Sequence, residues 1–74
     1  MGFSYNDWSK ALHNAGFIIK ERKKHMVAIK ATREKVYRVT ISRQGSKEVP
    51  RGLHKEMLKQ AGLTEKEFDN FLKR

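Results

Sequence analysis

The feature that most constrains the fold is a pair of alternating apolar segments joined by a short polar link. In the segment 36–42, VYRVTIS, the apolar or aromatic residues Tyr37, Val39 and Ile41 alternate with the polar residues Arg38, Thr40 and Ser42. This alternation is typical of a strand with one buried face. The segment 25–31, HMVAIKA, precedes it, and the polar link 32–35 has the length of a hairpin connection. The two segments therefore predict an antiparallel hairpin that is apolar on one face.

Segments with helical periodicity and one further strand flank this hairpin. Ser4 fits the N-cap of a first helix that ends at Gly16, and a short strand follows from Phe17. A second helix begins near Pro50 and ends at Gly62. The capping-box sequence TEKE then opens a short third helix.

The order of these segments predicts an α+β fold of the form α-β-β-β-α with a short C-terminal helix. We expect a two-layer sandwich in which the helices cover one face of a three-stranded antiparallel sheet. The other face of the sheet should be open to solvent. On it we expect Arg38, Thr40 and Ser42, and also Lys30.

Size and charge restrict what this chain can bind. A chain of 74 residues has room for one core, so a second domain or a large buried cofactor is not expected. It carries 17 Lys and Arg against 8 Asp and Glu, a net charge of +9 that attracts polyanions such as nucleic acid. It has no cysteine, which favours an intracellular protein. With no signal peptide or membrane span in the sequence, we expect a cytoplasmic protein.

Three sequence segments resemble the HicA family of toxin proteins. They are AGF after the first helix, VTISRQGSKEVPRG from the third strand onward, and LKQAGLTEKEF near the end, and the resemblance covers residues 4–71. It implies a single HicA-like domain over residues 1–74, with a fold similar to the double-stranded RNA-binding domain. It also implies an mRNA interferase, an endoribonuclease that acts on mRNA and is paired with a HicB-like antitoxin protein.

The resemblance further implies a catalytic role for one histidine. HicA-like proteins usually carry a segment similar to Gly-Ser-His-His at the start of the second strand, and its first histidine is catalytic. In this chain the corresponding segment is KKHM, so that His25 takes the catalytic position. Lys23 and Lys24 replace the Gly-Ser pair, and Met26 replaces the second histidine.

The chemistry of RNA cleavage fits these residue types. Cleavage by the 2′-hydroxyl of the RNA needs a base and an acid, and imidazole suits both roles because its ordinary pKa of about 6.5 lies near neutrality. Neighbouring cations can balance the charge that develops at phosphorus. We expect metal-independent cleavage, because the three histidines show no spacing typical of a metal site. The cations expected to contact phosphate are Lys23, Lys24, Arg43, Lys47 and Arg51.

Alternatives to a catalytic His25 remain at this point. His25 shares its strand parity with Val27 and Ile29, so alternation by itself places it on the face that packs against the helices. A structural histidine there would leave a non-catalytic RNA-binding module of the same fold. A third possibility is a basic adaptor that recognises an acidic protein. His13 and His54 are expected to be polar residues of the helices without a catalytic role.

Overall fold

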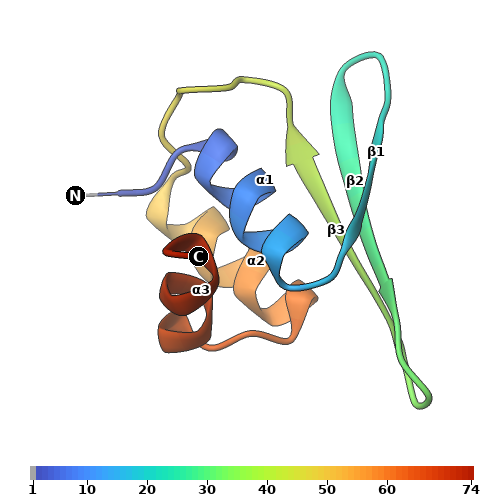
Figure 1. The fold of residues 1–74 in the computed structure, drawn as a ribbon. Coiled ribbons are helices and arrows are strands. Elements are labelled where there is room, and N and C mark those ends of the chain that lie inside the picture. The colour runs from blue at the N-terminus through green and yellow to red at the C-terminus, as the bar shows by residue number, and fades with distance from the viewer. Residues whose placement is uncertain (1) are drawn as a thin grey trace.

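The expected hairpin is present and its two strands have the expected bounds. A computed structural model describes residues 2–74 (Figure 1). Its elements follow in the order α1 (Tyr5–Asn14), β1 (Ile18–Glu21), β2 (His25–Ala31), β3 (Val36–Ser42), α2 (Arg51–Ala61) and α3 (Glu65–Leu72). This order confirms the predicted α+β arrangement with an additional C-terminal helix.

The three strands form an antiparallel sheet in the order β1-β2-β3, and all three helices lie on one side of it (Figure 1). The register places Met26 opposite Ile41 and Ala28 opposite Val39. These residues belong to or pack against the hydrophobic core between the sheet and the helices. The open face therefore carries the residues of opposite parity in β2 and β3.

Local signals in the sequence account for the ends of the helices. Ser4 and Asp7 form a reciprocal capping box at the start of α1, with hydrogen bonds of 2.9 and 3.1 Å. Thr64 and Glu67 repeat this arrangement at the start of α3. Gly62 ends α2 with a φ of 68°, a left-handed conformation that glycine adopts without strain.

The core joins the helical layer to the sheet. α2 packs on β3, while α1 packs on α3 and touches all three strands. The largest fully buried side chains of the core are Trp8, Phe68, Leu12, Ile41, Met57 and Val39. Between residues 2 and 74, no helix is both long and apolar enough to cross a membrane.

Candidate RNA-contacting surface around His25

His25 lies at the first position of β2, opposite Ser42 at the end of β3. Its side chain is exposed on the open face of the sheet, since its neighbour Met26 packs on the core. The expectation that strand parity directs His25 toward the helices is therefore wrong. Both sets of alternate positions in β2 contain apolar residues, so alternation within this strand could not identify its buried face. The pairing of β2 with β3 decides the orientation, because Val39 and Ile41 fix the core-facing side.

Lys30 also lies on the other side of the sheet from the one we expected. Its ammonium group donates a 2.8 Å hydrogen bond to the carbonyl of Ala15 at the end of α1. The same group lies 5.7 Å from the ring centroid of Phe17. Lys30 thus takes a helix-facing position in which its stem packs and its charge meets a helix C-terminus. It is not part of the open face.

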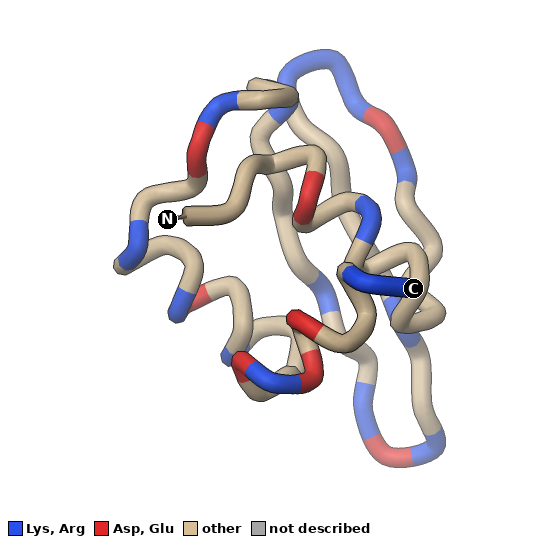
Figure 2. The backbone as a smooth tube through the Cα atoms, turned by 60° about the vertical axis from the view of Figure 1, so that its left-hand side comes forward, with Lys and Arg blue, Asp and Glu red and all other residues tan. Residues whose placement is uncertain are grey.

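A hollow on the open face brings His25 together with several cations. Its lining residues are Arg22, Lys23, Lys24, His25, Val27 and Arg38. Figure 2 shows the turn between β1 and β2 as a continuous run of cations. Lys23 and Lys24, two of the five expected phosphate contacts, therefore lie beside His25. His25 is the first residue of β2 and pairs with the last residue of β3, so its imidazole lies at the rim of this hollow, where a ligand in solution can reach it.

Arg38 completes the positive lining of the hollow from β3. It is the cross-strand partner of Ile29, two register positions from the pair Val27 and Thr40. The sequence places Arg38 on the open face, but its proximity to the cationic turn depends on the register of two strand pairs. Sequence reasoning therefore missed it as a site residue, and the signal that could have found it is the length of the 32–35 link, which sets the register.

Arg43 lies next to the hollow but contacts the backbone of the chain. Its Nη1 donates a 2.9 Å hydrogen bond to the carbonyl of Arg22, and its Nη2 lies 3.6 Å from a carboxylate oxygen of Glu21. The backbone N–H of Arg22 in turn donates to the carbonyl of His25 across 2.8 Å. Arg43 thus connects the end of β3 to the turn from which His25 emerges. Its side chain is still 45% exposed.

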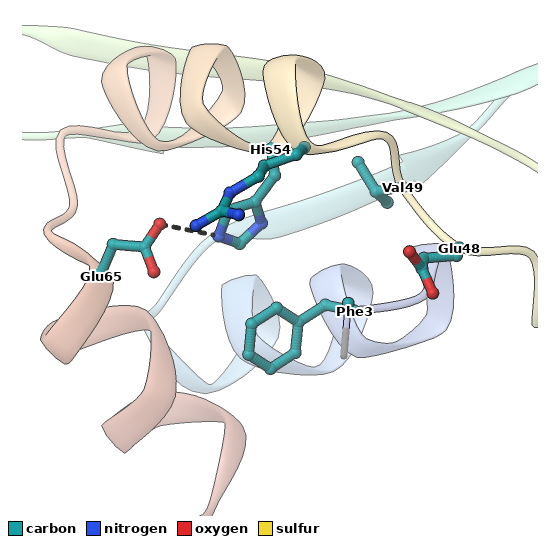
Figure 3. A pocket seen from close by; sticks show the side chains of 7 residues that line it. Phe3, Glu48, Val49, His54 and Glu65 are labelled. Atoms are coloured by element: carbon teal, nitrogen blue, oxygen red, sulfur yellow. Dashed lines mark ion pairs between the residues drawn. The ribbon is translucent and has the colours of Figure 1, made fainter.

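Lys47 and Arg51 are separate from this hollow. Lys47 lies in the loop before α2, where its carbonyl accepts a hydrogen bond of 3.1 Å from the backbone N–H of Tyr5. Arg51 begins α2 and lines a second pocket with Glu48, His54 and Glu65 (Figure 3). The carboxylates of Glu48 and Glu65 give this pocket a different charge character from that of the hollow around His25. The structure therefore divides the five expected phosphate contacts between different surfaces of the molecule.

His54 is a buried polar residue of the core and not a solvated one. It is 7% exposed, and its Nδ1 accepts a 3.0 Å hydrogen bond from the indole N–H of Trp8. Accepting this bond requires the tautomer that carries its proton on Nε2. Nε2 lies 3.3 Å from a carboxylate oxygen of Glu65, a contact that lacks the geometry of a hydrogen bond (Figure 3). His54 therefore connects α1, α2 and the start of α3.

Within residues 2–74, no group of three or more His, Asp or Glu side chains is arranged to hold a metal ion.

Comparison with known proteins identifies the family of the chain. No curated protein and no solved structure matches the chain. A family model described as the HicA toxin of bacterial toxin-antitoxin matches residues 5–63, which is most of the chain and includes the hollow around His25. The chain therefore belongs to the HicA toxin family and is the toxin of a bacterial toxin–antitoxin pair.

Proposed function

We propose that this protein is an RNA-cleaving toxin in which His25 transfers protons during cleavage. The observation that carries the proposal is the exposed imidazole of His25 at the rim of a cationic hollow. Membership of the HicA family gives the chain an antitoxin partner. We further propose that this partner is of the HicB type, that the RNA is mRNA and that the reaction occurs in the cytoplasm.

The proposed reaction uses the nucleophile that RNA already contains. The 2′-oxygen attacks the adjacent phosphorus and the bond from phosphorus to the 5′-oxygen breaks, which leaves a 2′,3′-cyclic phosphate and a 5′-hydroxyl. A base removes the proton of the 2′-hydroxyl, and an acid supplies a proton to the departing 5′-oxygen. His25 acts in one of these two steps. Lys23, Lys24 and Arg38 supply positive charge for the phosphoryl oxygens, whose negative charge grows in the transition state.

The group that acts with His25 must also lie on the open face. Ser42 satisfies this condition, since it is the cross-strand partner of His25 and its hydroxyl can hold the imidazole or a phosphate oxygen. Tyr37 does not, because its ring packs against the core on the helix side. Water is the remaining proton donor or acceptor in an open site of this kind.

A non-catalytic RNA-binding module is the second candidate function. The replacement of the family's Gly-Ser-His-His-like segment by KKHM favours it, because a second histidine is lost while positive charge is gained. Added lysines strengthen the attraction to phosphate but do not replace the imidazole that is lost. The same hollow would then bind RNA and leave it intact.

The chemistry of the RNA ends distinguishes these two functions. A long single-stranded RNA is incubated with the purified protein in the presence of EDTA, and the ends of the fragments are determined. The proposed toxin yields 2′,3′-cyclic phosphates and 5′-hydroxyls. Intact RNA that is retained on the protein identifies the binding module. Fragments that carry a 5′-phosphate would contradict the proposed reaction, because they require attack by water in place of the 2′-hydroxyl.

A further inference from the structure

Val27 is almost fully buried on a sheet face that no helix covers. It is 3% exposed, although it shares this face with His25 and not with the core-facing residues of β2. Its cross-strand partners are Lys20 on β1 and Thr40 on β3. All three helices lie on the other side of the sheet (Figure 1). Side chains that stand on the open face therefore cover Val27, and they form the hollow in which it is the apolar floor.

The composition of this hollow matches the two parts of a nucleotide. Its rim consists of cations from the β1–β2 turn and Arg38, which attract phosphate, while the aliphatic stems of these cations offer apolar surface above the buried Val27. A nucleobase has an apolar face, and single-stranded RNA exposes this face because its bases are unpaired. A base in a duplex is stacked on both sides and cannot enter this hollow.

Arg38 is the side chain best suited to hold such a base. Its guanidinium is planar and stacks on aromatic rings, which the compact ammonium group of lysine cannot do. Among the carboxylates of residues 2–74, none forms an ion pair with Arg38. Arg43, by contrast, is already bound to the backbone of the turn. The guanidinium of Arg38 is therefore available to a ligand.

We propose that the hollow formed by Val27, Arg38 and the β1–β2 turn is a subsite for one unpaired nucleobase beside the phosphate that His25 approaches. The base packs on the aliphatic stems that lie above Val27 and stacks on Arg38, while Lys23 and Lys24 contact the adjoining phosphate. This inference rests on the proposed function in one respect, that the ligand is RNA. It makes Arg38 a binding residue for one unpaired base of that RNA.

The test compares two oligonucleotides that differ only in the presence of bases. Both are single-stranded, carry 2′-O-methyl groups that prevent cleavage, and have the same length and charge, but one is abasic. Stacking contributes about five-fold or more in affinity per base, so the wild-type protein should bind the base-bearing strand at least about five-fold more tightly. Arg38→Lys keeps the charge and removes the planar group, and should bring the two affinities close together. Arg33→Lys is the matched control in the β2–β3 turn, and should retain the preference.

Each outcome decides the proposal separately from the proposed cleavage. Equal affinity of the wild-type protein for both strands, or a preference that survives Arg38→Lys, overturns the base subsite even if RNA is cleaved. A preference that depends on Arg38 supports the subsite even if no RNA is cleaved, in which case only the proposed reaction fails. Absence of binding to both strands also overturns it, and would leave the hollow as a surface for the antitoxin.

Discussion

The guanidinium of Arg43 donates a 2.9 Å hydrogen bond to the carbonyl of Arg22 and thereby ties the end of β3 to the turn that precedes His25. The N–H of Arg22 is bonded in turn to the carbonyl of His25. Arg43 is thus a positioning residue that acts through the backbone. Arg43, which the sequence suggested as a phosphate contact, forms a hydrogen bond that orders the turn before His25.

Replacement of Arg43 should loosen the turn without unfolding the domain. Arg43→Gln removes the bond to Arg22, and the amide of Arg22 should then exchange its hydrogen faster, because local opening of the turn becomes easier. The amide of Val39 in the core of the sheet should keep its protection. Hydrogen exchange followed by NMR measures both. Unchanged exchange at Arg22 would show that the turn holds its conformation without Arg43.

The buried pair of Trp8 and His54 should contribute to stability. His54→Ala leaves the indole N–H of Trp8 without an acceptor, at a cost of about 1–3 kcal/mol, and creates a cavity beside Phe68 that adds to it. We expect the free energy of unfolding to fall by about 2 kcal/mol or more in urea denaturation. His13→Ala, at an exposed position of α1, should change it by about 0.5 kcal/mol or less. Similar values for the two variants would contradict a structural role for His54.

The salt dependence of RNA binding should identify the surface that contacts phosphate. Each phosphate contact on a single strand contributes about 0.7 to the slope of log affinity against log salt concentration. Replacing Lys23 and Lys24 together by Gln should therefore reduce this slope by about 1.4. Replacing Lys66 in α3 and Lys73 at its C-cap by Gln removes the same charge from the helical layer, and should leave the slope nearly unchanged. An equal reduction by both pairs would indicate attraction by net charge without a defined surface.

Most of the fold follows from local signals that the sequence displays. The N-cap at Ser4, the capping box at Thr64, the helix end at Gly62 and the strand 36–42 each depend on residues close together in the chain, and each occurs where it was predicted. The likeness to a double-stranded RNA-binding domain stays a prediction, because no solved structure matches the chain.

The site was less predictable because it depends on pairings between distant segments. The buried face of β2 is decided by its register with β3, and the bond of Arg43 to Arg22 spans 21 positions. The partner of Trp8 is His54, which lies 46 positions away. A single sequence contains the residues of these contacts but does not specify which of them meet. The cations nearest His25 in the chain, Lys23 and Lys24, were therefore easier to assign than Arg38.

The most direct test of the account is the rate of RNA cleavage by a His25→Ala variant. Wild-type protein, His25→Ala and the exposed control His13→Ala are each purified in the same way and incubated with one single-stranded RNA in EDTA. Loss of a proton-transfer group typically lowers a rate about 100-fold or more, so His25→Ala should be nearly inactive while His13→Ala cleaves at the wild-type rate. Equal cleavage by wild type and His25→Ala would contradict the central claim, because the activity would then come from another residue or from a contaminating nuclease.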